Sequence, residues 1–103
     1  MKPSKPYKND LMRDLKNHSV ALGYLNTVFE EGDEEALLLA LRDVAEAHGL
    51  AKVARHAHLN RENLYKILSR NGNPTIYSLI NILDAFGLRL AVALKDSVHK
   101  KAA

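Results

Sequence analysis

The sequence contains no cysteine and no long apolar segment, and each absence excludes a class of protein. Without cysteine there can be no disulfide, no thiol catalysis and no thiolate zinc site. The longest apolar run covers residues 36–41, whereas a membrane-spanning helix needs about 20 such residues. No apolar stretch of the kind found in a secretory signal follows the basic N-terminus. We therefore expect a cytoplasmic protein that does not associate with a membrane.

Length and composition favour one small globular domain. The chain has 103 residues, of which 47% are hydrophobic and 26% charged, which is usual for a folded soluble protein. No segment repeats another. We expect an N-terminal arm over residues 1–17, a folded domain over residues 18–95 and a polar tail over residues 96–103.

Apolar residues recur at helical spacing through most of the chain, and this pattern predicts five helices. The helices are expected over residues 18–31, 34–48, 50–57, 61–70 and 76–86. Gly32 suits a left-handed helix end, and Asp33, Asn60 and Thr75 suit helix N-caps. Three of the helices have an apolar stripe that should face the core: Ala21, Leu25, Val28 and Phe29; Leu37, Leu41, Val44 and Ala45; and Leu79, Ile80, Leu83 and Phe86. Residues 7–16 fit either a short helix or an extended arm.

Residues 88–94 change to the two-residue period of a strand. Leu88, Leu90, Val92 and Leu94 alternate there with Arg89, Ala91 and Ala93. A lone strand must pair with something, so either the N-terminal arm or a second protein chain should supply the partner. The predicted fold class is thus all-α, a five-helix bundle with one short C-terminal β-strand.

Residues 50–69 have the apolar pattern of a helix-turn-helix. Two short helices that cross steeply need a small residue where they meet, and Ala54 supplies it. The residues expected to pack between the helices and under the turn are Val53, Ala57, Leu59, Leu64, Ile67 and Leu68. This packing leaves the polar side of the second helix facing outward.

The outward side of the second helix carries residue types that read DNA in the major groove. Arg61 can bind guanine and Asn63 can bind adenine, each through two hydrogen bonds, while Glu62 can accept from cytosine or orient Arg61. The residues predicted to read bases are Asn60, Arg61, Glu62, Asn63 and Tyr65. The residues predicted to contact phosphate are Lys52, Arg55, Lys66, Ser69, Arg70 and Thr75. The competing interpretation is an ordinary pair of surface helices.

The net charge of +3 is unevenly distributed, and the distribution favours DNA binding. Residues 50–70 carry five Lys/Arg and one Asp/Glu, so the basic stretch coincides with the predicted DNA face. Residues 30–46 show the reverse, with seven Asp/Glu and one Lys/Arg.

Four stretches together resemble a known family: YLNTVFEEGD (residues 24–33), ALRDVAEAHGL (residues 40–50), NRENLYKILSRNGNPT (residues 60–75) and LINILDAFGLRLAV (residues 79–92). They are similar to the addiction-module antidote proteins, which are Xre-type, lambda-repressor-like antitoxins related to the host-inhibition-of-growth family. The resemblance covers about two thirds of the chain. It implies a five-helix bundle, a homodimer that binds a palindromic operator in its own promoter, and a RelE-like toxin as partner. One departure is His58, which stands where the motif usually has glycine.

Other sites are less well supported by the sequence. His48, His56 and His58 invite a metal, but they lack a cysteine or an HExxH spacing, and we expect neither metal nor cofactor. The acidic residues Glu30, Glu31, Asp33, Glu34 and Glu35 suit helix capping, with a bound cation or a docked basic toxin as alternatives. The segment Gly72-Asn73-Pro74 is a turn and lacks the residues of a phosphate-binding loop. No catalytic constellation is present, and we do not expect an enzyme.

Three functions remain open at this point. The first is a dimeric antitoxin that regulates its own operon and neutralises a RelE-like toxin. The second is a stand-alone Xre-type repressor without a toxin. The third is a protein-interaction module that does not bind DNA.

Overall fold

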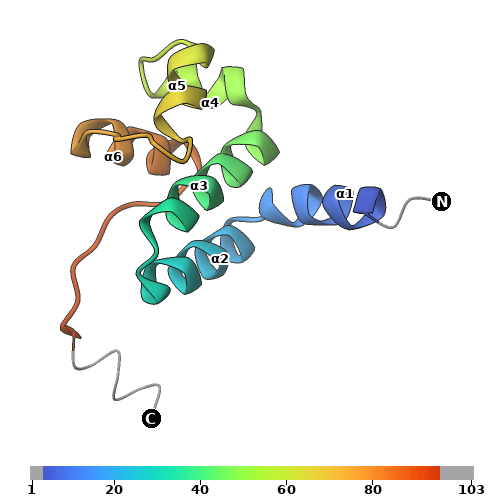
Figure 1. Cartoon of the computed structure of the whole chain (residues 1–103), viewed down its shortest axis with the longest axis horizontal. Helices are drawn as coiled ribbons and strands as arrows, with labels where there is room; N and C mark the ends of the chain where they lie inside the picture. The colour runs from blue at the N-terminus through green and yellow to red at the C-terminus, as the bar shows by residue number, and fades with distance from the viewer. Residues whose placement is uncertain (1–3, 96–103) are drawn as a thin grey trace.

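The computed structural model describes residues 4–95, with side chains from Asp10 onward, and this part of the chain contains six helices and no strand (Figure 1). The helices follow one another closely along the chain: α1 (Ser4–Leu15), α2 (His18–Glu31), α3 (Glu34–His48), α4 (Leu50–His56), α5 (Arg61–Ile67) and α6 (Ile76–Ala85). The all-helical architecture agrees with the predicted all-α class, but this part of the chain has one helix more than predicted and lacks the predicted strand.

Helix α3 is the centre of the molecule. Helices α1, α2 and α4 pack against α3, and α4 in turn packs against α5 and α6. The fully buried core residues come from all six helices or the residues just after them, and the largest are Leu15, Leu41, Val44, Val53, Leu64, Leu68, Ile82 and Phe86. No polar or charged residue is buried among the described residues. Burial of this apolar surface is the main force that holds the helices together.

Local capping sets where the helices begin. The side chains of Asn17, Asp33, Asn60 and Thr75 each accept a hydrogen bond from a backbone N–H in the first turn of the following helix. Gly32 ends α2 in the left-handed conformation, with φ of 75°. The predicted caps at Asp33, Asn60 and Thr75 and the left-handed end at Gly32 are confirmed.

Of residues 7–16, which fit either a helix or an extended arm by pattern alone, all but the last belong to helix α1. The side chain of Leu15 is fully buried, and Leu11 and Met12 pack partly against the core. The C-terminal end of α1 is therefore anchored to the body. The bundle gains a sixth helix that the sequence did not specify.

The predicted strand is absent in the described part of the chain. Residues 88–94 are uncoiled chain that first lies beside α2 and α6 and then leaves the helices (Figure 1). Helix α1 cannot pair with them as a strand, because its backbone N–H and C=O groups are used within the helix. The alternation of apolar residues is a real feature of the sequence, but no strand within residues 4–95 pairs with it.

Two further expectations are corrected by the structure. The helix predicted over residues 61–70 ends at Ile67, and the chain then turns through Leu68, which has φ of −101° and ψ of 24°. The side chains of Phe29 and Ile80 are 41% and 43% exposed, although both were expected to face the core. Ile82 occupies the core position on α6 instead.

The described residues contain neither a membrane-spanning helix nor a cluster of metal-ligating side chains. None of the described helices is both long enough and apolar enough to cross a membrane. Within residues 4–95, no three His, Asp or Glu side chains come together as metal ligands would.

Candidate nucleic-acid interface

Helices α4 and α5 form a tight pair joined by a four-residue turn. Their contact is apolar: Val53, Ala54, Ala57, Leu64 and Leu68 are all buried, while Leu59 and Ile67 pack partly against them. The small side chain of Ala54 lets the two helices approach, as expected. The predicted interior of this pair is thus confirmed.

The turn between α4 and α5 depends on one residue with unusual backbone geometry. His58 has φ of 61°, the only positive φ outside glycine in the described chain. This conformation reverses the chain so that the N–H of Leu59 reaches the carbonyl of Ala54 at 2.8 Å. His58 therefore adopts the left-handed conformation for which glycine is the usual residue.

The residues predicted to read bases lie on the exposed side of α5. Arg61, Glu62 and Asn63 are exposed, and Tyr65 is 43% exposed. Asn60 differs from them because its side-chain oxygen accepts a hydrogen bond from the backbone N–H of Asn63 at 2.7 Å. Asn60 therefore has a structural role as the cap of α5, and only its side-chain NH2 group remains to donate to another partner.

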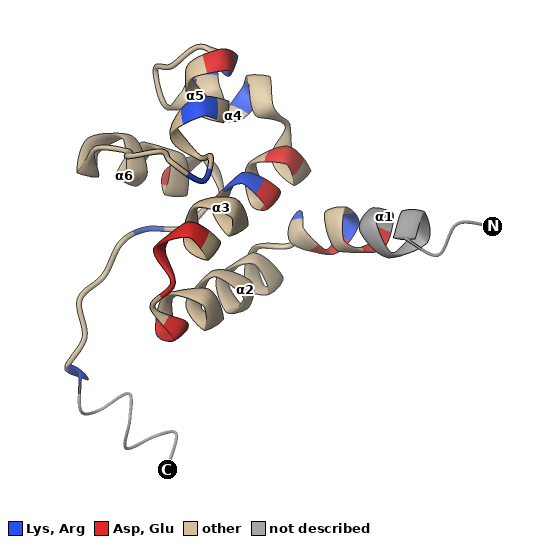
Figure 2. Ribbon diagram, in the orientation of Figure 1, with Lys and Arg blue, Asp and Glu red and all other residues tan. Residues whose placement is uncertain are grey.

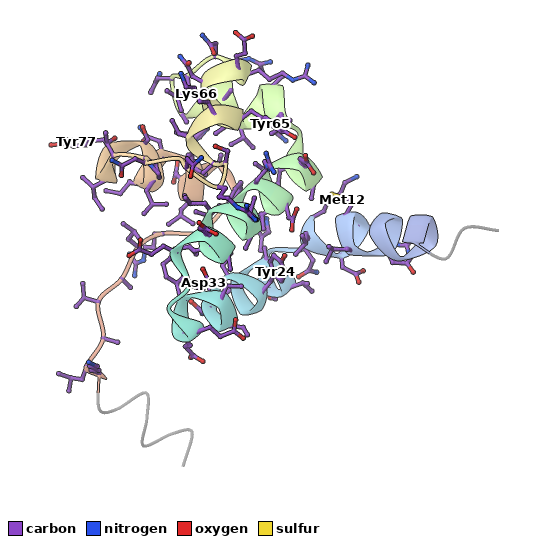
Figure 3. The ribbon with its side chains drawn as sticks, in the orientation of Figure 1. Met12, Tyr24, Asp33, Tyr65, Lys66 and Tyr77 are labelled. Carbon is purple, nitrogen blue, oxygen red and sulfur yellow. The ribbon has the colours of Figure 1, made fainter. Side chains whose placement is uncertain are left out.

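The ring of Tyr65 contacts Arg42, a residue that the sequence pattern did not assign to the site. The guanidinium of Arg42, on α3, lies 4.5 Å from the centroid of the Tyr65 ring. Such a cation–π contact is worth about 0.5–1 kcal/mol at an exposed site. Arg42 and Tyr65 are far apart in sequence, so no local pattern could have paired them. Figure 3 shows the position of Tyr65 on α5.

A groove of about 710 Å³ runs beside the start of α5. Four of the predicted base-reading residues line it, together with two residues from the junction of α3 and α4: Asn60, Arg61, Glu62 and Tyr65, with Glu46 and Leu50. The structure therefore brings most of the predicted reading residues to one concave surface.

The six predicted phosphate contacts divide into two groups. Lys52, Arg55 and Lys66 are exposed and form no ion pair within the described residues. The other three have partners inside the chain: Arg70 lies 3.6 Å from Glu35, Ser69 donates to the carbonyl of Lys66, and Thr75 caps α6. The first group is better placed to meet a phosphate.

The charges separate along the molecule. Basic residues mark α4 and α5, and acidic residues mark the turn between α2 and α3 (Figure 2). Asp33 caps α3 at that turn, and Glu34 and Glu35 lie in the first turn of α3, where negative charge stabilises the helix. Capping thus accounts for part of the acidic cluster.

Three of the histidines, His18, His48 and His56, make contacts between helices. His56 on α4 donates to the carboxylate of Asp84 on α6 at 2.6 Å, and His18 on α2 donates from Nδ1 to the carbonyl of Phe86 at the same distance. The ring of His48 packs on that of Phe86, with centroids 5.4 Å apart. These contacts join α6 to α4, and the residue after α6 to the start of α2 and the end of α3.

Among the described residues, His48 is the one titratable group whose pKa the structure clearly shifts. Burial lowers its pKa, because the charged ring would lose hydration, and the nearby His18, Lys52 and Lys16 lower it further. The backbone of Leu15 acts in the opposite direction. The ring nitrogen Nε2 is buried and has no hydrogen-bond partner, which fits a neutral ring.

The turn after α5 requires glycine at position 72. A Cβ added there would overlap the backbone carbonyl of Ile67. The N–H of Gly72 also donates to the carbonyl of Ser69 at 2.9 Å. The GNPT stretch is therefore a structural turn that leads from α5 to the capped start of α6.

Comparison with known proteins gives the family. The model of the family described as "Probable addiction module antidote protein" matches residues 6–94 of this chain. An uncharacterized protein of Haemophilus influenzae is 41% identical over 83 residues, which are 81% of this chain and 86% of that protein. No solved structure matches the chain significantly.

These findings define an antidote, or antitoxin, as the class of protein. The chain belongs to the family of probable addiction module antidote proteins. Membership in an antidote family implies a toxin as partner.

Proposed function

We propose that this antidote protein acts as a homodimer that binds operator DNA through α4 and α5, represses its own operon and neutralises a RelE-like toxin. In this proposal α4–α5 is a helix-turn-helix of the Xre type, related to the host-inhibition-of-growth antitoxins. Helix α5 is its recognition helix.

The main support for DNA binding is that α5 is amphipathic, with one side buried against α4 and the other exposed. Leu64 is fully buried against α4, while Arg61, Glu62 and Asn63 project from the first turns on the exposed side. A recognition helix uses these first turns to contact base edges in the major groove. Arg61 and Asn63 then provide two-bond contacts to guanine and adenine.

The exposed cations beside α5 supply the sequence-independent part of binding. Lys52 and Arg55 on α4, and Lys66 on α5, have no carboxylate partner within residues 10–95. Each can neutralise one phosphate without first breaking an ion pair. This distinguishes them from Arg70, which would have to leave Glu35.

Two substitutions test the proposal with DNA from the region upstream of the gene. Arg61→Ala should weaken binding by about 1–3 kcal/mol and relax the preference at one base pair. Lys66→Ala should weaken binding to all duplexes alike and reduce the slope of log affinity against log salt by about 0.9. Both effects are measured by fluorescence anisotropy titrations at several salt concentrations.

Arg13→Ala is the matched control, because it removes the same charge from an exposed arginine that already pairs with Asp10 on α1. It should leave the affinity unchanged. If Arg61→Ala and Lys66→Ala also bind as the unaltered protein does, α5 is not the DNA surface. If the unaltered protein binds no duplex, the interaction-module function takes the place of DNA binding.

A further inference from the structure

Residues 88–94 form an apolar segment in which Leu88 packs partly against the core, while the described residues leave the large apolar side chains beyond it exposed. The segment begins after Gly87, whose φ of 80° turns the chain away from α6. Leu90 is 37% exposed, Leu94 77% and Val92 100%. Three large apolar side chains in water within one short segment indicate a partner that covers them.

The backbone from Arg89 to Ala93 has no hydrogen bond within the described residues. The last hydrogen bond before it runs from the N–H of Leu88 to the carbonyl of Leu83. An extended chain with free donors and acceptors is a template for pairing with another strand.

The segment is complementary to itself in one antiparallel register. If Ala91 of one copy lies opposite Ala91 of another, Leu90 faces Val92 and Leu88 faces Leu94 across the pair. All four apolar side chains then share one face of the ribbon, because alternate residues of a strand point to the same side. In the same register Arg89 faces Ala93, so no two positive charges are opposed.

An apolar groove on the body supports such a ribbon. The groove has a volume of about 290 Å³ and lies between the segment and helix α2. Its apolar lining includes Leu22 and Phe29 of α2, which are 48% and 41% exposed, and Leu90 of the segment. A two-stranded ribbon alone is only marginally stable and needs packing against another element, which this groove provides.

We propose that a second copy of this chain is the partner, and that residues 88–94 of the two copies pair as an antiparallel two-stranded ribbon centred on Ala91. This inference rests on the homodimer of the proposed function and names its interface. The exposed apolar residues of α2 then lie beside the ribbon and are covered by it.

Because the chain has no cysteine, a single introduced thiol tests the register. In the proposed ribbon the two copies of residue 91 have Cα atoms about 4.5–5.5 Å apart, within the range of a disulfide. Ala91→Cys should therefore form a covalent dimer under mild oxidation, seen on a non-reducing gel. Ala93→Cys is the control, because its two copies would lie about 13 Å apart along the ribbon and should cross-link far less.

A pair of charge substitutions tests the apolar face. Val92→Asp should raise the dimer dissociation constant by about tenfold or more, because both copies lose an apolar cross-strand pair. Val92 is fully exposed in the single chain, so the change should not affect folding. Ala93→Asp carries the same charge on the other face, opposite Arg89, and should keep the dimer. Analytical ultracentrifugation of the full chain measures both.

The results of these experiments distinguish failure of the ribbon from failure of the proposed homodimer. A dimer that fails to cross-link through Ala91→Cys and survives Val92→Asp overturns the ribbon but leaves the homodimer and DNA binding intact. A chain that stays monomeric at every concentration overturns the ribbon and the homodimer together. Selective cross-linking at position 91 with loss of the dimer in Val92→Asp supports the ribbon.

Discussion

His58 shows how one residue can determine the geometry of the candidate DNA surface. Its φ of 61° closes the turn between α4 and α5, and a residue with a Cβ adopts this conformation at a cost of about 1–2 kcal/mol. Since the side chain of His58 is exposed, no packing contact offsets that cost. The turn is therefore strained at the residue that sets the angle of α5.

We predict that His58→Gly raises the free energy of unfolding by up to about 1 kcal/mol. Glycine removes the strain, although its greater freedom in the unfolded chain offsets part of the gain. His58→Val should lower the stability by about 1–2 kcal/mol, because a β-branched residue fits this conformation poorly. Urea unfolding followed by circular dichroism measures both changes. Equal stability of the two variants would show that the turn is not strained.

Helix ends meet at a small cluster of rings, and this cluster fixes the elements around the candidate site. His18 begins α2, His48 ends α3 and Phe86 follows α6, with the His18 and His48 ring centroids 6.1 Å apart. A Cβ at Gly87 would lie 2.5 Å from the His18 ring and would displace it, and the φ of 80° at this position also favours glycine. Because α4 starts two residues after His48, the cluster also positions α4.

We predict that acid weakens the fold through His48. Its pKa is lowered in the folded chain, chiefly by burial, so the unfolded chain binds the proton more readily. The contribution of neutral His48 is fully present above its unfolded pKa of about 6.5 and is lost as the pH falls from there toward its folded pKa. Urea unfolding at a series of pH values from 8 down to about 5 should show the decrease.

His48→Phe should remove part of this pH dependence, because phenylalanine keeps a ring against Phe86 and does not titrate. His58→Asn is the matched control: it removes an exposed histidine and places there a residue that tolerates the left-handed conformation. If His48→Phe retains the full pH dependence of the unaltered protein, His48 is not its source.

The whole molecule separates its charges, and this separation suggests two surfaces with different partners. The unpaired cations Lys52, Arg55 and Lys66 lie on α4 and α5, while the acidic turn between α2 and α3 lies away from these two helices (Figure 2). An antidote protein has a toxin as partner, and our proposal adds DNA as a second one. A basic toxin would meet the acidic turn and leave the DNA surface free.

We predict that the two activities can be separated by mutation. Arg61→Ala should lose operator affinity but still rescue growth of cells that express the toxin encoded beside it. The reason is that Arg61 lies on α5 and makes no contact with the acidic turn. The readouts are a growth assay and co-purification of the toxin with the full chain. Loss of both activities in a folded Arg61→Ala protein would mean that toxin and DNA share one surface.

The sequence alone determined the features that depend on near neighbours in the chain. The caps at Asp33, Asn60 and Thr75 were predictable because each bonds to a backbone N–H three residues further on. The buried side of the α4–α5 pair followed from apolar spacing within twenty residues. The family motif usually has glycine at position 58, the residue that most readily adopts the left-handed conformation found there.

Only the tertiary structure decided the features that depend on distant parts of the chain. Residues 7–15 are helical and pack against α3, where Leu15 is buried, and no local pattern could show that surface. The exposure of Phe29 and Ile80 depends on which neighbours cover them, as does the contact of Arg42 with Tyr65. Residues 88–94 keep the alternation of a strand but have no strand partner within residues 4–95, because a strand is completed by hydrogen bonds to another chain segment.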